Sequence, residues 1–237
     1  MMIAPVPRSI AAGKVAAHPK KLVVVGDSLV YGFGDPEGGG WVERLRRRSL
    51  SPHSSGPVIY NLGVRGDGVP QVAQRLSQEF RSRGELRNRI PDLLILSVGV
   101  NDSAQAGSKG GRNFTPFEIY QSKLDTLLTQ VVSLCPVLFI GTVPVNEAAM
   151  PFAEILHYSH EQQYRYKQAA AQICQRRAVP YLDLFELWLS RGEQWWRSQL
   201  AEDGVHPNVS GHRAMLQDIT NWQPFQAATD FAWVNLE

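Results

Sequence analysis

Residues 22–29 have the sequence LVVVGDSL. The apolar run at its start lacks polar alternation, which is typical of a strand buried on both faces of a sheet. The glycine turn at its end carries Ser28 just past this strand, at the carboxyl edge of the predicted sheet. Four further runs have the same apolar character: Val58–Leu62, Leu93–Val98, Val137–Thr142 and Val179–Leu184.

Segments with helical periodicity separate these runs. They are Trp41–Leu50, Pro70–Leu86, Pro116–Leu134 and Ala153–Arg177, and a last helix is expected from Ser210. Thr115 precedes a proline and lies three residues before Glu118, which predicts that Thr115 caps the third of these helices. Because strands alternate with helices, we predict an α/β fold whose parallel sheet has helices on both faces.

The chain is expected to form one domain, because its sequence contains no internal repeat and no evident linker. We place this domain at residues 21–222, after an N-terminal extension at residues 1–20. The remaining segment, residues 223–237, contains Phe225, Phe231 and Trp233. Such an apolar tail is expected to pack back on the domain.

The 237-residue chain is 43% hydrophobic and 19% charged, as soluble globular proteins are. Its formal net charge is only +2, so no overall field favours nucleic acid or an anionic membrane as a partner. No apolar run has the length of a secretory signal or of a membrane span. We therefore expect a cytoplasmic location without stable membrane insertion, with Cys135 and Cys174 as reduced, packed thiols. The sequence does not indicate an oligomeric state.

The hydroxyl of Ser28 is a candidate nucleophile, and a serine nucleophile needs an adjacent base. We expect that base in residues 203–208, with the sequence DGVHPN. Asp203 and His206 are three residues apart, so the carboxylate can accept the Nδ1–H of the imidazole and leave Nε2 to take the serine proton. Each motif also has a structural alternative. The Gly-Asp-Ser turn can begin a helix with Asp27 or Ser28 as its cap, and the histidine loop can be an ordinary turn.

Two loops that follow other predicted strands supply candidate oxyanion donors. Residues 99–102, with the sequence GVND, follow the third strand, and the side-chain NH₂ of Asn101 can point toward a developing oxyanion. Residues 61–68, with the sequence NLGVRGDG, follow the second strand, and Gly66 can offer its backbone N–H. The alternative for Asn101 is ordinary turn chemistry after a strand.

Taken together and in this order, the four motifs resemble those of the GDSL lipase/esterase family, also called the SGNH hydrolases. The match runs from residue 22 to about residue 213. The residues that match the family motifs are Ser28, Gly66, Asn101, Asp203 and His206. The resemblance implies that residues 21–222 form a flavodoxin-like three-layer α/β/α sandwich, with a five-stranded parallel sheet of order 2-1-3-4-5. It also implies an oxyanion hole formed by the backbone N–H groups of Ser28 and Gly66 and the side chain of Asn101.

No cofactor is expected, because the resemblance implies ester hydrolysis without metal or organic groups. A metal site at Asp203, His206 and His212 is an alternative for the last motif, but these residues lack a recognised ligand spacing. Gly32-Phe33-Gly34 begins a dinucleotide-binding pattern, which Glu37 breaks.

The leading functional hypothesis is a serine esterase or acylhydrolase that cleaves small-molecule esters through an acyl-enzyme, with short-chain acyl esters or lysolipid-like molecules as substrates. We expect four residues to contact the substrate: Asp27, Phe114, Val145 and Val205. The loop at 103–115 is rich in glycine and serine, which favours short acyl chains, whereas the loop at 144–160 is more apolar and leaves chain length open. One alternative is a carbohydrate O-deacetylase that uses the same residues. The other is a non-catalytic flavodoxin-like binding module whose motifs only form loops.

Overall fold

The structure, a computed structural model, describes residues 19–50, 56–82, 90–231 and 233. Its centre is a five-stranded sheet whose neighbouring strands all run parallel. The strands are β1 (Lys21–Gly26), β2 (Val58–Gly63), β3 (Leu93–Ser97), β5 (Val137–Ile140) and β7 (Tyr181–Leu182). Their order across the sheet is β2-β1-β3-β5-β7. Counted among these strands alone, the order is 2-1-3-4-5, so the predicted topology is confirmed.

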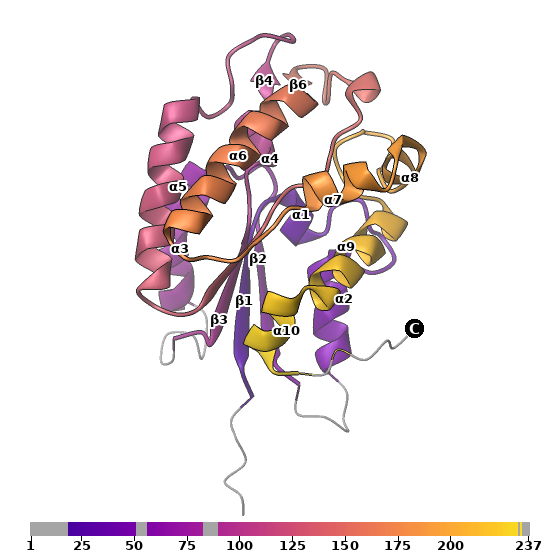
Figure 1. Cartoon of the computed structure of the whole chain (residues 1–237). Coiled ribbons are helices and arrows are strands. Elements are labelled where there is room, and N and C mark those ends of the chain that lie inside the picture. Colours follow the sequence, from indigo (N-terminus) through magenta and orange to yellow (C-terminus); the bar gives the residue numbers. More distant parts are fainter. Residues whose placement is uncertain (1–18, 51–55, 83–89, 232, 234–237) are drawn as a thin grey trace, which may run out of the picture.

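Helices cover both faces of the sheet and make three layers with it (Figure 1). The longer helices are α2 (Gly40–Ser49), α3 (Val69–Ser82), α5 (Phe117–Val132), α6 (His160–Arg176), α7 (Leu184–Ser190) and α9 (Val209–Asn221). Val23 and Val25 of β1 belong to the core shared with α3, α5 and α6, whereas Leu22 and Val24 belong to the core shared with α2, α7 and α9. Every residue of β1 and β3 is buried, as their uninterrupted apolar runs predict.

The helix expected at Ala153–Arg177 begins later than predicted. It starts at His160, with Ser159 as its N-cap. Ala153 and Glu154 have positive φ values of 48° and 64°, a left-handed conformation that a right-handed helix cannot contain. The helical periodicity of the sequence therefore begins several residues before the helix itself.

Thr115 does not cap the helix that follows it. The N-cap residue of α5 is Pro116, which makes no side-chain cap hydrogen bond. The Thr115 side chain instead hydrogen-bonds to the buried carboxyl group of Asp102. The motif marks the start of a helix, as expected, but its side chain stabilises the loop after β3.

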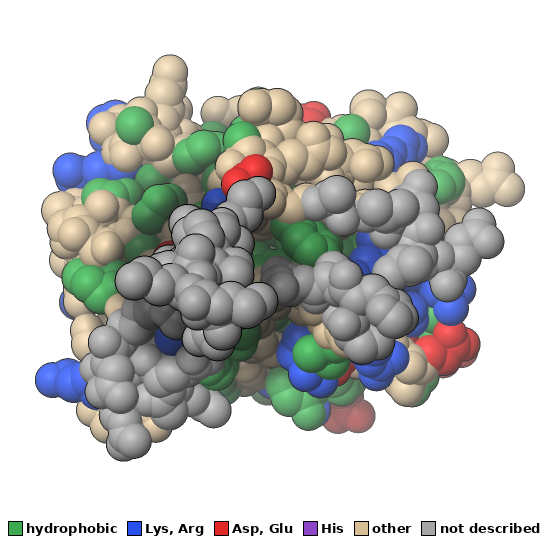
Figure 2. All heavy atoms as spheres, turned by 90° about the horizontal axis from the view of Figure 1, so that it is seen from below, with side chains coloured by type: hydrophobic (Ala, Val, Ile, Leu, Met, Phe, Trp, Pro, Cys, Tyr) green, Lys and Arg blue, Asp and Glu red, His purple; other side chains and the backbone are tan. Residues whose placement is uncertain are grey.

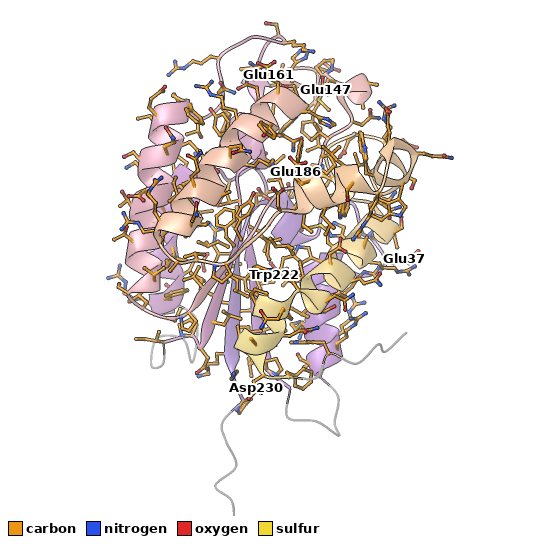
Figure 3. The ribbon with its side chains drawn as sticks, in the orientation of Figure 1. Glu37, Glu147, Glu161, Glu186, Trp222 and Asp230 are labelled. Carbon is orange, nitrogen blue, oxygen red and sulfur yellow. The ribbon has the colours of Figure 1, made fainter. Side chains whose placement is uncertain are left out.

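Several short elements without a clear sequence pattern gather at the carboxyl end of the sheet. The two-residue strands β4 (Gln105–Ala106) and β6 (Leu156–His157) pair antiparallel and join the loops that follow β3 and β5. The short helices are α1 (Ser28–Tyr31), α4 (Val100–Ser103), η2 (Glu147–Ala149) and α8 (Glu193–Ser198). Glu147 lies at this end of the molecule and accepts a hydrogen bond from the first backbone N–H of α6 (Figure 3).

Both ends of the chain are described only in part. The structure describes the N-terminal extension from residue 19 and the tail at residues 223–231 and 233, and residues 83–86 of the helix predicted at Pro70–Leu86 lie outside it. Within the tail, α10 (Gln223–Thr229) follows α9 directly after Trp222 (Figure 3). Phe225 is fully buried, and its ring lies 5.5 Å from that of Trp233. The described part of the tail therefore packs on the helices of one face.

The surface at the amino end of the sheet mixes side chains of all kinds. Seen from that end, hydrophobic, basic and acidic groups share the described surface (Figure 2). No helix in the described part of the chain is long and apolar enough to cross a membrane. Cys135 and Cys174 are free and buried, which confirms the expected packed thiols.

Candidate active site

Ser28 lies where β1 ends, at the carboxyl edge of the sheet. It is the first residue of α1, and the side chain of Asp27 caps this helix by accepting a hydrogen bond from the backbone N–H of Leu29 at 2.9 Å. Gly26 allows the turn to lie against β3, since a Cβ at this position would be 1.9 Å from the carbonyl oxygen of Ser97. The Gly-Asp-Ser turn therefore begins a helix with Asp27 as its cap, which was the structural alternative for this motif. The same turn also places the Ser28 hydroxyl at the carboxyl edge of the sheet.

A continuous hydrogen-bonded chain joins Ser28, His206 and Asp203. The serine Oγ lies 2.8 Å from Nε2 of the imidazole, and Nδ1 lies 2.7 Å from Oδ2 of Asp203. Burial raises the pKa of Asp203, but hydrogen bonds from His206 and Val205 outweigh it and hold this pKa below its ordinary value. Because an ionised carboxylate only accepts, Nδ1 carries the proton, Nε2 accepts, and the serine hydroxyl donates.

The loop that carries His206 is held in place from both sides. The backbone N–H of Asn208 donates to the carbonyl of Gln199 at 2.9 Å, and the Asn208 side chain caps α9. Gly34, in the loop after α1, has a φ of 96°. Because it has no side chain, it can lie directly against the loop that carries His206: a Cβ at this position would be 2.2 Å from the carbonyl oxygen of Pro207. These contacts hold the imidazole beside the serine.

Two aromatic rings flank the imidazole of His206. Phe33 packs edge-on with a centroid distance of 4.5 Å, and Phe152 lies at 5.7 Å. The guanidinium carbon of Arg65 lies 4.0 Å above the Phe33 ring. Ser28 and His206 are only 4% and 5% exposed, so the two groups are recessed among their neighbours.

The candidate oxyanion donors come from three neighbouring strand ends. Nδ2 of Asn101, in α4 after β3, donates to the carbonyl of Asp67 at 2.9 Å. Gly66 precedes that carbonyl in the chain, is exposed and has a φ of 83°. A backbone hydrogen bond of 3.0 Å ties the start of this loop to the end of β1. Ser28 begins α1, and the first N–H groups of a helix have no partner within it.

Arg75, Asp102 and Tyr158 support these loops, although sequence patterns did not single them out. Arg75 donates to the carboxylate of Asp67 at 2.7 Å and also to two strand-end carbonyls. Asp102 accepts the first backbone N–H of α3 at 3.0 Å. The hydroxyl of Tyr158 donates to Oδ1 of Asn101 at 3.2 Å. Asp102 follows Asn101 in the GVND motif, whereas Arg75 and Tyr158 lie outside all four motifs, so no local sequence pattern indicates them.

Two buried carboxyl groups lie close to the site. Burial raises the pKa of Asp27 to about 7; the backbone N–H of Leu29 opposes this rise, and the nearby carboxyls of Asp102 and Asp67 add to it. Burial likewise raises the pKa of Asp102 to about 6, against the effect of its hydrogen bonds. Oδ2 of Asp27 is buried and has no hydrogen-bond partner among the described residues. A neutral carboxylic acid suits this position, because an unpaired buried charge is costly.

We expect Asp27→Asn to remove a pH dependence from the stability of the fold. The folded-state pKa of about 7 lies above the ordinary value of 3.8, so the stability that protonated Asp27 contributes is fully present below about pH 4 and is lost as the pH rises through 7. A pKa that differs by one between the folded and unfolded states corresponds to about 1.4 kcal/mol, so the whole effect amounts to a few kcal/mol. Asparagine keeps the acceptor for the Leu29 N–H but cannot ionise.

The measurement is the free energy of unfolding in urea for both proteins at pH 5, 6, 7 and 8. The variant should gain on the wild type as the pH rises, because all other titrating groups are shared. Parallel curves for the two proteins would show that Asp27 is already ionised at pH 5.

The four predicted substrate contacts differ in how exposed their side chains are. Phe114 is 50% exposed, whereas Asp27, which adjoins Ser28, is only 1% exposed. Val145 and Val205 are 0% and 2% exposed and belong to the hydrophobic core. Three of these four side chains therefore offer little surface to a ligand in this structure, and contact with the substrate stays a prediction for all four.

His212 does not join Asp203 and His206 in a metal site. Its Nδ1 accepts from the backbone N–H of Trp41 at 3.3 Å, and its Nε2 lies 2.9 Å from the carbonyl oxygen of Phe33. Burial lowers its pKa, which favours the neutral ring that these two bonds require. No cluster of three or more His, Cys, Asp or Glu side chains within the described ranges is arranged to hold a metal ion.

A parallel three-layer sandwich that carries a linked serine, histidine and aspartate at its strand ends is typical of serine hydrolases. The chain belongs to the GDSL-like lipase/acylhydrolase family, whose model matches residues 24–214. The matched region begins within β1 and ends within α9, so it contains every motif of the candidate site. The resemblance noted from the sequence is therefore confirmed.

Solved structures support the same fold. A lipase/acylhydrolase from Enterococcus faecalis is 20% identical, with a TM-score of 0.66 over 84% of this chain and 93% of its own. An acetylxylan esterase from Geobacillus stearothermophilus is 18% identical, with a TM-score of 0.64 over 92% of this chain and 97% of its own. An enzyme from the metagenome of Lake Arreo, Spain, is 20% identical, with a TM-score of 0.62 over 89% and 95%. A search of curated proteins finds no match.

Proposed function

We propose that this protein is a serine esterase that cleaves carboxylic esters through an acyl-enzyme intermediate. The observation that carries the proposal is the hydrogen-bonded chain from the Ser28 hydroxyl through His206 to Asp203, with links of 2.8 and 2.7 Å. Membership of a lipase/acylhydrolase family supports it. So do the catalytic mutants of the G. stearothermophilus acetylxylan esterase, in which a serine, an aspartate or a histidine is replaced by alanine.

In the first half of the reaction, Oγ of Ser28 attacks the ester carbonyl carbon while its proton passes to Nε2 of His206. The carbonyl oxygen becomes an oxyanion that accepts from the N–H groups of Ser28 and Gly66 and from Nδ2 of Asn101. Asp203 stays ionised and stabilises the imidazolium. The bond to the alcohol oxygen then breaks, and His206 returns the proton to the departing alcohol.

In the second half, a water molecule attacks the acyl group on Ser28. His206 takes a proton from this water and gives it to Oγ as the ester to the serine breaks. The carboxylic acid leaves and the serine hydroxyl is restored. Each proton that His206 accepts is released within the same half-reaction, so the cycle needs only water as co-reactant.

The surroundings of Ser28 favour a small acyl group. The nucleophile is 4% exposed, so a substrate must bring its carbonyl group to a recessed hydroxyl. The apolar side chains of the loop at 144–160 mostly pack inward: Met150, Phe152 and Leu156 lie against the hydrophobic core. Ile155, at 60% exposure, is the exception. The loop that left acyl-chain length open in the sequence therefore uses much of its apolar surface in packing against the core, which leaves less of it for a long acyl chain.

We expect faster hydrolysis of acetyl and butyryl esters than of palmitoyl esters. A long acyl chain gains affinity only where it can bury apolar surface, at about 25 cal/mol per Å². The measurement is kcat/KM for p-nitrophenyl esters of increasing acyl length, kept below the concentration at which the longer esters form micelles. A maximum at palmitoyl would contradict the assignment to short chains, and hydrolysis of no ester in the series would overturn the proposed function.

O-deacetylation of a carbohydrate is the second candidate. The fold likeness to an acetylxylan esterase, which spans 97% of that chain, favours it together with the recessed serine. Both candidates use the same three residues, so they differ only in the alcohol that leaves. The two candidates are separated by measuring kcat/KM for acetylated xylose and for p-nitrophenyl acetate, which carry the same acyl group. A carbohydrate deacetylase should have the higher kcat/KM for the sugar.

A further inference from the structure

Asn101 has a side chain whose orientation needs an outside constraint. The last torsion of an asparagine is broad and roughly two-fold, so rotamer preference alone does not decide where its NH₂ group points. To serve an oxyanion, Nδ2 must keep one hydrogen directed at the reacting carbonyl throughout the reaction. The hydrogen bonds around Asn101 therefore determine how well the donor is aimed.

Two partners hold the amide of Asn101 in one orientation. The Asp67 carbonyl can only accept, and it lies 2.9 Å from Nδ2. This turns Oδ1 toward Tyr158, whose hydroxyl donates to it at 3.2 Å. One Nδ2 hydrogen is used by Asp67 and the other is left for an oxyanion. Without the hydroxyl, Oδ1 would lose this partner and the amide would be held at one point only.

The hydroxyl of Tyr158 is itself firmly placed. The residue is 3% exposed and stands between β6 and Ser159, the N-cap of α6. Its ring lies edge-on to that of Phe152 at 6.1 Å. Burial and the nearby carboxyls of Asp27 and Asp203 raise the pKa of Tyr158 above its ordinary value, so the group is a proton donor at every assay pH.

We propose that Tyr158 is a positioning residue for ester hydrolysis, whose hydroxyl orients the Asn101 amide toward the oxyanion. The inference rests on the proposed esterase function and adds a residue that lies 57 positions from Asn101 in the chain. Tyr158 follows β6, which pairs with β4. The hydrogen bond therefore links the loop after β5 to a donor that follows β3.

Tyr158→Phe tests this role, because it removes the hydroxyl and keeps the ring. We expect kcat to fall about tenfold, less than the ~10²–10³ that loss of an oxyanion donor costs, since the amide is still present but poorly aimed. KM should stay within about twofold, because the oxyanion bond strengthens only in the transition state. Tyr166→Phe is the matched control: it also removes a buried hydroxyl, one that donates to the Thr115 carbonyl at 2.6 Å, and it should leave kcat unchanged.

A double-mutant cycle with Asn101→Ala separates positioning from any other effect of Tyr158. If the hydroxyl acts through Asn101, Tyr158→Phe should change kcat less than about twofold once Asn101 is alanine. An equal fall in both backgrounds, or a single variant with wild-type kcat, would overturn the role. Melting curves on each protein show whether it is folded at the assay temperature, and if the phenylalanine variant is not, the whole cycle is repeated at a lower temperature at which it is folded.

The same experiment keeps this role apart from the esterase function. Turnover of p-nitrophenyl acetate by the wild type, and its loss in Ser28→Ala, establishes the function whatever Tyr158 does. A wild type without turnover would overturn the function and the positioning role together. A normal wild type with an unaffected Tyr158→Phe variant would overturn the positioning role alone.

Discussion

Ser28→Ala should lower kcat for ester hydrolysis by about 10⁴- to 10⁶-fold, since loss of a member of a serine–histidine–aspartate triad has an effect of this size. The variant lacks the atom that forms the acyl-enzyme, and only the oxyanion donors and substrate binding are left. The measurement is the rate of p-nitrophenyl acetate hydrolysis, with active-site titration to exclude traces of wild type. A fluorophosphonate probe, which labels only an activated serine, should label the wild type and not the variant.

Folding of Ser28→Ala is the control. Ser28 is buried, but the change deletes a single oxygen, and the imidazole keeps its hydrogen bond to Asp203 at 2.7 Å. We therefore expect a change in the free energy of unfolding of about 1 kcal/mol, as for one lost hydrogen bond. Turnover within a few fold of wild type in a folded variant would remove Ser28 from the mechanism. It would favour the alternative in which the Gly-Asp-Ser turn only begins a helix.

The layers of this protein could be predicted from the alternation of strands and helices in its sequence, whereas the strand order was predicted from its resemblance to a known family. Strands such as β1 and β3 are buried throughout, so their apolar runs have no competing pattern. Helix ends were less predictable. Ala153 and Glu154 have left-handed backbone conformations, so α6 begins only after them. Nothing in the helical periodicity of that segment indicates these conformations. The pairing of β4 with β6 involves two residues from each strand, which is too few to leave an alternating pattern.

The residues of the candidate site also differ in how well the sequence predicts them. Ser28, Asn101 and His206 stand in short motifs directly after strands or within a turn, and parallel topology brings such positions to one edge. Tyr158 instead hydrogen-bonds to a residue 57 positions away in the chain, and Arg75 to residues at least 8 positions away. Neither residue lies in a motif. For Val145 and Val205, the sequence placed the residues near the site but could not indicate that the core buries their side chains.

Asn101→Ala should lower kcat by about 10²- to 10³-fold, which corresponds to ~2.7–4 kcal/mol of transition-state stabilisation. KM should change little, because the Nδ2 bond gains strength only as the carbonyl oxygen gains charge. The structure also gives Asn101 a structural task, since Nδ2 donates to the Asp67 carbonyl at 2.9 Å. If that bond were its whole contribution, the substitution would cost about 0.5–1.5 kcal/mol of stability and leave kcat near wild type.

Kinetics and melting on the same Asn101→Ala preparation distinguish these two roles. Asn101→Asp strengthens the comparison, because it replaces the donor by a carboxylate that faces a developing negative charge, and it should be at least as slow. Arg75 ties Asp67 to the strand ends independently, with a 2.7 Å bond to its carboxylate, so the loop that carries Gly66 should survive the loss of Asn101. We therefore expect a small change in melting temperature beside a large loss of kcat. A lowered melting temperature with kcat within about threefold of wild type would leave Asn101 a turn residue, and the oxyanion would then depend on the backbone N–H groups of Ser28 and Gly66.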